Sequence, residues 1–259
     1  MSRDSPYNEG QLPAMKLESQ IAKFRSLLLT DASGYTYERL TFRMQQLFGT
    51  LPIFEKRILE IGAGNGAMSI WLALNGAGHV TALEPEAAGA SPGIRTELER
   101  RIADIGLTNL TFLPRALDDA PLVPGTFDII LSYNSINHLH ETRADLNSSR
   151  HDRERFVQIF RGLNRLLTRD GVAIIADCSR NNLFGALGIT HLLPGLRPVE
   201  WALHQHPRTW ISVMREAGFR RFDLHWYVPY VLRNIRTLAD NALFSWLTIS
   251  HFTFRAFRE

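Results

Sequence analysis

The chain has 259 residues, of which 45% are hydrophobic and 21% are charged, as in ordinary soluble globular proteins. This length suits one substantial core, so one domain with appendages is expected rather than two independent domains. The formal net charge of only +3 argues against a clustered basic face, and we therefore expect no nucleic-acid partner.

The cysteine content and the lack of long apolar runs bear on the compartment. Cys178 is the only cysteine, so no intramolecular disulfide can form. This cysteine content is compatible with a reducing compartment. Residues 1–10 are polar and lack the apolar core of a signal peptide. No stretch reaches the roughly 18 consecutive apolar residues of a membrane-spanning helix. We expect a cytoplasmic protein with no integral membrane segment.

The first predicted elements are two amphipathic helices. Apolar residues recur at spacings of three and four over residues 14–28 and again over 37–51. Both segments precede a glycine-rich stretch, and we predict that residues 1–54 form an N-terminal helical cap over a substrate site.

Strands and helices then alternate along the chain. Five short apolar strands are predicted, at residues 58–61, 79–83, 110–113, 127–131 and 172–176. Helices are predicted between them, from about residue 67, over 94–105 and over 156–167. Such alternation predicts a parallel sheet with helices on both faces.

The last third of the chain changes character. Residues 181–198 are rich in Gly, Leu and Pro without a clear period, as expected of a loop or lid over a pocket. A helix over 206–217 follows, and residues 220–227 and 248–257 are predicted to be two strands.

Residues 58–66, Ile-Leu-Glu-Ile-Gly-Ala-Gly-Asn-Gly, are the most informative stretch. Gly62, Gly64 and Gly66 would let the backbone turn sharply and approach a ligand without interference from a Cβ atom. A helix beginning near Ala67 would point its free N–H groups toward that ligand. The stretch resembles the first motif of class I S-adenosyl-L-methionine (SAM) dependent methyltransferases, an acidic residue followed by Gly-x-Gly-x-Gly.

The resemblance implies a fold and a cofactor. The fold is α/β, a Rossmann-like seven-stranded mixed sheet with helices on both faces. Residues 55–180 would form the SAM-binding core, 181–206 a lid inserted after the fifth strand, and 207–259 a helix and an antiparallel strand pair that complete the sheet. The implied cofactor is SAM.

The resemblance also implies which residues contact the cofactor, when the family's motif positions are matched to this sequence. Glu60 and the glycine loop would lie along the methionine side of SAM, and Glu84 would accept hydrogen bonds from the ribose hydroxyls. Many relatives have an acidic residue near the adenine where this chain has Ala116. Asp118 would take that role from a shifted loop, with Leu117 packed on the adenine ring. The predicted cofactor residues are Glu60, Gly62, Ala63, Gly64, Gly66, Glu84, Pro85, Leu117, Asp118 and Asn134.

Candidate catalytic residues follow the fourth strand, at the edge of the sheet where open α/β folds bind ligands. Methyl transfer needs the acceptor to be aligned and, for a hydroxyl, deprotonated, and histidine is a natural base. His138 is the first choice, because residues 138–139 resemble the His-Leu end of the fourth motif of small-molecule O-methyltransferases. His140 and Glu141 are alternatives, and a capping role for His138 stays equally open. The segment lacks the Pro-Pro-Tyr/Phe signature of many methyltransferases that act on nucleobase amines, so base methylation is disfavoured.

The remaining histidines suggest a pocket wall rather than a metal centre. No histidine pair shows a convincing ligand spacing on one element, so we expect no metal. Trp201, His204 and His206, with Phe184 from the apolar lid, are the predicted substrate contacts for a small, partly apolar acceptor.

The sequence is therefore compatible with three functions. The favoured one is SAM-dependent methyl transfer to a small acceptor, at a hydroxyl oxygen. An NAD-dependent oxidoreductase is the main alternative, since Gly62, Gly64 and Ala67 also fit the relaxed dinucleotide pattern. Glu60 would oppose a pyrophosphate, and the chain has no Tyr-x-x-x-Lys pair. A non-catalytic binding protein on the same scaffold is the third. The sequence does not fix the oligomeric state and is compatible with a homodimer.

Overall fold

A computed structural model describes residues 11–30, 34–85, 93–190, 198–227 and 229–259. The side chains of residues 11–14 are outside this description. Among the described residues, no helix has the length and apolar character needed to cross a membrane.

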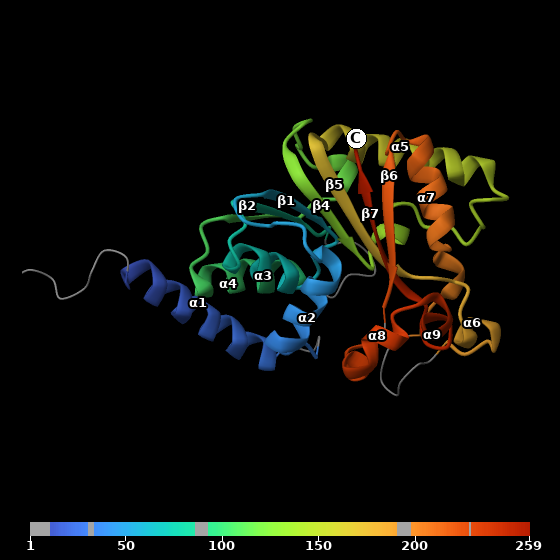
Figure 1. Cartoon of the computed structure of the whole chain (residues 1–259). Coiled ribbons are helices and arrows are strands. Elements are labelled where there is room, and N and C mark those ends of the chain that lie inside the picture. The colour runs from blue at the N-terminus through green and yellow to red at the C-terminus, as the bar shows by residue number, and fades with distance from the viewer. Residues whose placement is uncertain (1–10, 31–33, 86–92, 191–197, 228) are drawn as a thin grey trace, which may run out of the picture.

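One seven-stranded sheet organises the chain, with the strands in the order β3-β2-β1-β4-β5-β7-β6 (Figure 1). The first five strands run parallel, and β7 is antiparallel to both β5 and β6. This arrangement confirms the predicted Rossmann-like mixed sheet. The strands are β1 (Arg57–Ile61), β2 (His79–Leu83), β3 (Leu110–Leu113), β4 (Phe127–Tyr133), β5 (Leu167–Cys178), β6 (Arg221–Trp226) and β7 (His251–Phe257).

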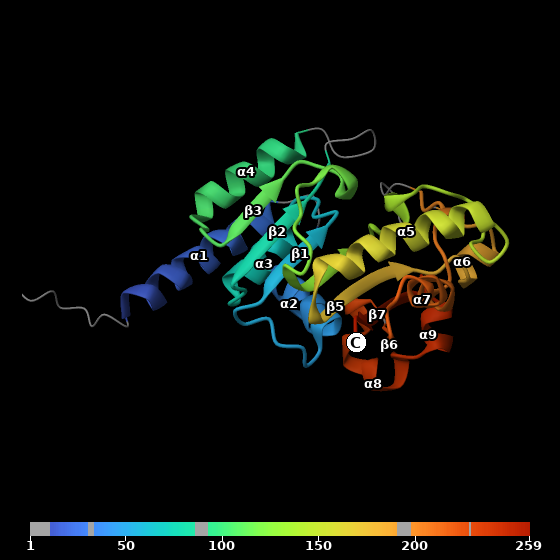
Figure 2. The same ribbon diagram turned by 90° about the horizontal axis from the view of Figure 1, so that it is seen from above.

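Helices cover both faces of the sheet. The α-helices of the described residues are α1 (Gln11–Leu29), α2 (Tyr37–Phe48), α3 (Ala67–Leu74), α4 (Ile94–Ile105), α5 (Arg150–Leu166), α6 (Leu183–Ala186), α7 (Pro207–Glu216), α8 (Arg236–Ala239) and α9 (Ala242–Trp246). Shorter 3-10 turns are η1 (Leu117–Asp119), η2 (Ile136–Leu139), η3 (Trp201–Leu203) and η4 (Tyr230–Ile235). Figure 2 shows α1, α3 and α4 together on one side of the molecule, and α5 and α7 together on the other.

The alternation of side chains along the strands divides the core between these two layers. In β1, Ile58 packs in the cluster that contains residues of α1, α2 and α3, while its neighbour Leu59 packs in the cluster with α5 and α7. The second cluster is centred on aromatic rings: Trp210 of α7 meets Phe156 and Phe160 of α5 edge-on, at centroid distances of 4.8 and 5.9 Å. The sheet is therefore buried on both faces, as a parallel sheet requires.

The N-terminal helices pack against the sheet layer. α1 contacts α3 and α4, and α2 contacts α3 and β5. Their buried side chains, such as Phe24 and Met44, belong to the main core. The division of the chain into a separate cap, core and lid stays a prediction, and residues 191–197 of the predicted lid lie outside the described residues.

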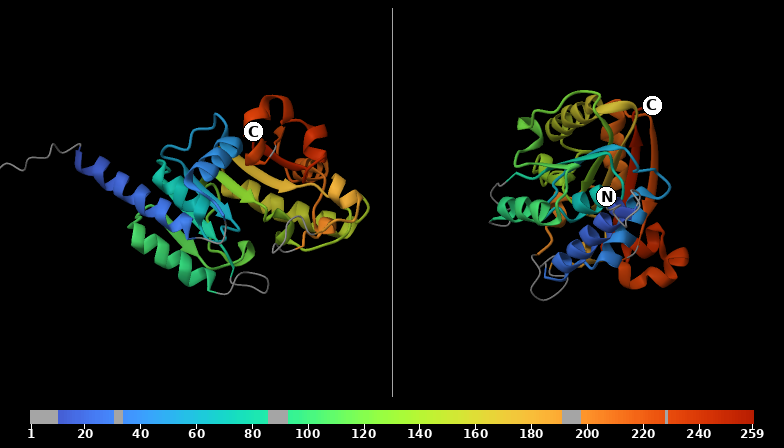
Figure 3. Two further views of the ribbon diagram at one scale, coloured as in Figure 1. Left: turned by 90° about the horizontal axis from the view of Figure 1, so that it is seen from below. Right: turned by 90° about the vertical axis from the view of Figure 1, so that its left-hand side faces the viewer.

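Two details differ from the predicted elements. The fifth strand, expected at residues 172–176, begins earlier, at Leu167: this residue pairs with Phe127, and regular pairing resumes at Val172 opposite Ile129. The last strand begins at His251 rather than residue 248, because α8, α9 and η4 are inserted between β6 and β7. Figure 3 shows this red insertion projecting from the sheet.

The turn between β1 and α3 is built on left-handed glycines. Gly62, Gly64 and Gly66 have φ angles of 72°, 53° and 76°, which residues with a Cβ atom adopt at a cost. A Cβ atom on Gly62 would lie 2.4 Å from Cβ of Ser135, whereas one on Gly64 would meet no atom within 4 Å. Gly62 is thus required for close packing of the loop after β4 as well as for its backbone angle.

This contrast makes a matched pair of variants. Gly62→Ala and Gly64→Ala both place alanine in the left-handed region, at about 1–2 kcal/mol each. Only Gly62→Ala also forces Ser135 to move, so its free energy of unfolding should fall by at least about 1 kcal/mol more than that of Gly64→Ala. Urea denaturation of the two variants measures the difference, and equal losses would show that the contact with Ser135 carries no strain.

Candidate functional site

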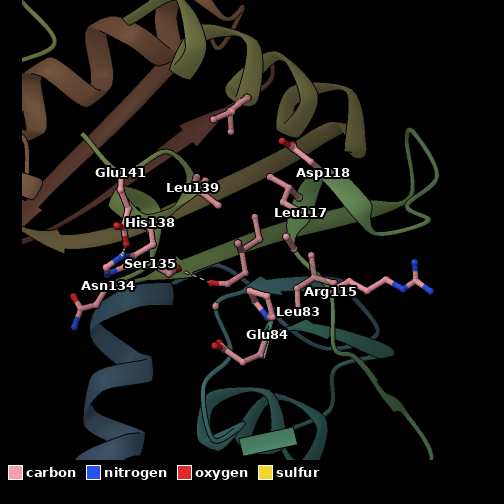
Figure 4. A pocket seen from close by; sticks show the side chains of 15 residues that line it. Leu83, Glu84, Arg115, Leu117, Asp118, Asn134, Ser135, His138, Leu139 and Glu141 are labelled. Atoms are coloured by element: carbon pink, nitrogen blue, oxygen red, sulfur yellow. Dashed lines mark hydrogen bonds and ion pairs between the residues drawn. The ribbon is translucent and has the colours of Figure 1, made fainter. Parts of the chain in front are cut away.

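A cavity of about 390 Å³ opens at the carboxyl ends of β1, β2 and β4 (Figure 4). This is the edge at which open α/β sheets bind ligands. Six of the ten predicted cofactor residues line it, namely Gly62, Glu84, Pro85, Leu117, Asp118 and Asn134.

Glu84 follows β2 and turns its carboxylate back toward the glycine loop. Its Oε2 accepts a hydrogen bond from the backbone N–H of Gly64 at 2.8 Å. Partial burial raises the pKa of Glu84 above its ordinary value, against the opposing effects of this hydrogen bond and of His138. The carboxylate stays on the cavity wall, where it can accept hydrogen bonds from a ligand's hydroxyl groups.

Ser135 joins the loop after β4 to the end of β1. Its hydroxyl donates to the carbonyl of Ile61 at 2.6 Å and lies 2.8 Å from Oγ of Ser132. The preceding Asn134 has a positive φ of 51°, a conformation that asparagine tolerates better than most residues. This local turn places Asn134 and Ser135 on the cavity wall.

Glu60 lies beneath the glycine loop and does not line this cavity. It is only 2% exposed, and the Ser69 hydroxyl of α3 donates a hydrogen bond to its Oε2. Burial is the main cause that raises the pKa of Glu60 to about 8, and the nearby Glu84 adds to it. Burial therefore disfavours the ionised form of this carboxyl group, and its contact with the methionine part of SAM stays a prediction.

The predicted adenine side is formed by the 3-10 turn η1. Leu117 and Asp118 lie on the cavity wall, and Ala116 precedes them. Asp118 also accepts a hydrogen bond from Arg155 of α5 at 2.9 Å. The predicted residues Ala63, Gly64 and Gly66 belong to the turn but do not line the cavity.

Several wall residues were not predicted from the sequence. Ile61 and Leu83 are the last residues of β1 and β2, so the strand-end position itself was a usable signal. Ile159 comes from α5, far along the chain, and no local pattern marks it. The full set of additional wall residues is Ile61, Leu83, Arg115, Ala116, Ser135, Leu139 and Ile159.

A second cavity of about 640 Å³ adjoins the first. The two share His138 and Glu141 on their walls. Nδ1 of His138 lies 2.8 Å from Oε1 of Glu141, and both side chains are more than half exposed, at 54% and 65%. The lining residues of the second cavity are Asn137, His138, Glu141, Thr142, Arg143, Pro198, Val199, Glu200, Leu203 and His204.

The third catalytic candidate, His140, lines neither cavity. Its Nε2 lies 2.9 Å from Oδ1 of Asp152, and its ring packs edge-on to Phe156 at 5.6 Å. Both partners belong to α5, so this histidine fastens the loop to that helix. A catalytic role of His140 stays a prediction.

The four predicted substrate contacts do not meet in one cavity. Trp201 is buried and donates its indole N–H to the carbonyl of Ile189 at 2.8 Å, and His206 caps α7 by accepting from the N–H of Arg208. Phe184 lies in α6 and lines neither cavity. Only His204 lies on the wall of the second cavity.

One group of potential metal ligands was missed from the sequence. Ligand atoms of Asp177, Cys178 and His204 lie within 4.8 Å of one another, at the end of β5. His204 follows Cys178 by 26 positions and Asp177 by 27 positions, a separation that a search for closely spaced ligands cannot detect.

Comparison with known families and structures gives a consistent answer. Residues 58–171 match the family model described as a methyltransferase domain. No curated protein matches the chain significantly.

Solved structures match over most of the chain. A SAM-dependent methyltransferase from Thermotoga maritima is 16% identical with a TM-score of 0.56, covering 91% of this chain and 100% of that one. A counterpart from Mesorhizobium loti is 17% identical with a TM-score of 0.56, covering 82% of this chain and 95% of that one.

A phosphoethanolamine N-methyltransferase from Haemonchus contortus, in complex with S-adenosylhomocysteine, is 13% identical with a TM-score of 0.57. The match covers 86% of this chain and 52% of that one. At these identities the structures establish the fold, and the family model adds a methyltransferase domain over residues 58–171, which is less than half of the chain. Residues 58–171 therefore match a methyltransferase domain, and the chain has the fold of class I SAM-dependent methyltransferases.

Proposed function

We propose that this enzyme transfers the methyl group of SAM to a hydroxyl oxygen of a small, partly apolar molecule. The observation that carries the proposal is the pair of adjoining cavities at the sheet edge, which share His138 and Glu141. A methyl donor in the first cavity and an acceptor in the second would meet at this common wall. Methyl transfer is a displacement at carbon, so such alignment is the main catalytic requirement.

The wall chemistry of the second cavity supports the choice of acceptor. Pro198, Val199 and Leu203 provide apolar surface. Arg143 and Glu200 form an ion pair at 2.7 Å, so their charges are already matched. A small molecule with an apolar body and a polar group fits such a mixture better than a polyanion does.

The proposed cofactor contacts follow the first cavity. Glu84 would bind the ribose hydroxyls, Gly62 and Asn134 the methionine side, and Leu117 with Asp118 the adenine. Their support is that all five line one cavity, Gly62, Glu84 and Asn134 directly after strands and Leu117 with Asp118 in η1.

An acceptor screen tests the reaction. The purified enzyme is incubated with methyl-labelled SAM and with matched pairs of phenols, aliphatic alcohols and the corresponding primary amines. We expect labelled methyl ethers to form. Labelled amines alone would move the activity to nitrogen, the atom methylated by the similar Haemonchus enzyme as its name states.

Glu84→Ala should weaken SAM binding by about 10- to 100-fold, because hydrogen bonds to a charged group contribute about 1.5–3 kcal/mol. Isothermal calorimetry with SAM measures the change. Glu99→Ala, which removes a half-exposed carboxylate from α4, is the matched control and should bind SAM normally. Unchanged affinity of Glu84→Ala would exclude the ribose contact.

His138→Ala should lower the rate of methyl transfer about tenfold or more while SAM affinity stays within about threefold, because the lost group acts on the acceptor. Turnover and calorimetry are measured on the same preparation. His151→Ala removes an exposed histidine of α5 and should alter neither property. Equal losses of rate and affinity in His138→Ala would place this side chain in the cofactor site instead.

A further inference from the structure

We propose that His204, oriented by the buried Asp177, is the base that receives the proton of the methyl acceptor. The inference rests on the proposed function of the second cavity. It assigns to His204 a catalytic role, and to Asp177 the role of a positioning residue.

The two side chains form a directed pair at the end of β5. Nδ1 of His204 lies 3.0 Å from Oδ1 of Asp177. Asp177 is completely buried, and the same oxygen accepts a hydrogen bond from the N–H of Cys178 at 2.8 Å. Since a carboxylate only accepts, Nδ1 of His204 must carry the proton that it donates.

The other ring nitrogen of His204 is directed by this arrangement. The ring lines the second cavity, and none of the described residues forms a hydrogen bond with its Nε2. With the proton held on Nδ1, Nε2 keeps its lone pair. His204 therefore presents an acceptor to whatever occupies the cavity, as a base requires.

The backbone around His204 is held in place by polar contacts. Arg180, which follows β5, donates from its Nε to the carbonyl of His204 at 2.6 Å and from its guanidinium to the carbonyls of Ala202 and Ala144. Gln205 also donates to the carbonyl of Ala144, at 2.8 Å. The segment that carries His204 is thus fastened to the loop that carries Glu141 and Arg143 on the same cavity wall.

His138 lacks such support. Its side chain is 54% exposed, and its carboxylate partner Glu141 is 65% exposed, so water competes for both groups. The His204 side chain is 13% exposed and that of Asp177 is fully buried. A buried carboxylate fixes the tautomer and balances the charge of a protonated ring far better than an exposed one. His138 is then left to position the acceptor at the wall between the cavities.

The proton and electrons balance in the resulting step. The acceptor oxygen attacks the methyl carbon of SAM, the new C–O bond forms, and the C–S bond breaks with its electron pair going to sulfur. The acceptor proton moves to Nε2 of His204. The products are the methyl ether, neutral S-adenosylhomocysteine and the imidazolium of His204, which faces Asp177. The imidazolium later releases its proton to water.

Cys178 lies beside the pair of Asp177 and His204. Its Sγ lies 3.4 Å from Nδ1 of His204, so the three side chains could suggest a zinc site. Burial, with the Asp177 carboxylate, raises the pKa of the Cys178 thiol well above its ordinary value, which keeps it in the protonated form. Nδ1, the nitrogen nearest the thiol, is already committed to Asp177. Cys178 is therefore a neighbour of the pair and has no part in the proton transfer.

Nitrogen NMR tests the assignment without an acceptor. The protein is labelled with ¹⁵N-histidine, and His204 is assigned from the signals missing in His204→Gln. We expect the neutral ring to carry its proton on Nδ1, and Asp177→Asn to shift the population toward the tautomer protonated on Nε2. A wild-type ring protonated on Nε2 would overturn the proposal, because it could not accept a proton from the cavity.

Kinetics with an acceptor from the screen provide the second readout. His204→Gln should lower methyl transfer by about 10²- to 10⁴-fold, and Asp177→Asn by about 10²-fold, with SAM affinity within about threefold of wild type. Cys178→Ser is the control and should keep both properties. A His204→Gln rate within threefold of wild type would overturn the proposal, as would stoichiometric zinc that Cys178→Ser removes. Failure of the wild-type enzyme to bind SAM would instead contradict the proposed function, whichever tautomer His204 adopts.

Discussion

The close approach of three neighbouring strand ends is the constraint on which the site depends. The glycine turn after β1 lies between the residues that follow β2 and β4. On one side the Glu84 carboxylate accepts from the N–H of Gly64, and on the other the Ser135 hydroxyl donates to the carbonyl of Ile61. No Cβ atom fits between Gly62 and Ser135. The loop after β4 can therefore pack this closely against the turn only because Gly62 has no side chain.

The electrostatics of this edge favour a cationic cofactor. Glu60 and Glu84 lie near each other, and burial raises the pKa of both. A sulfonium and an ammonium group would relieve the cost of placing negative charge here, whereas a pyrophosphate would add to it. The charge of the ligand thus distinguishes SAM from a dinucleotide, whereas the glycine pattern is common to the binding sites of both.

Most of the fold could be predicted from the sequence because its elements have local signatures. The buried strands are short apolar runs, and the helices show the expected spacing, as at Phe156, Phe160 and Leu163 in α5. The insertion of α8 and α9 was missed, because its many exposed apolar residues, Leu238 and Leu243 among them, show no amphipathic period. The start of β5 was misplaced because Arg169, Asp170 and Gly171 form a typical turn sequence inside a strand.

The site was predictable where a strand end defines it and unpredictable where distant segments meet. Glu84 and Asn134 follow strands directly, and both lie on the cavity wall. Asp177 precedes the predicted lid and His204 lies near the lid's end, so only the folded chain brings the two side chains together. His140 shows the opposite case, since a histidine in the right loop turns away to α5.

The central claim is that the first cavity binds SAM, and calorimetric titration of the wild-type enzyme with SAM, S-adenosylhomocysteine and NAD in parallel tests it most directly. We predict that the two adenosyl ligands bind with micromolar affinity and that NAD does not bind. Binding of NAD alone would contradict the account.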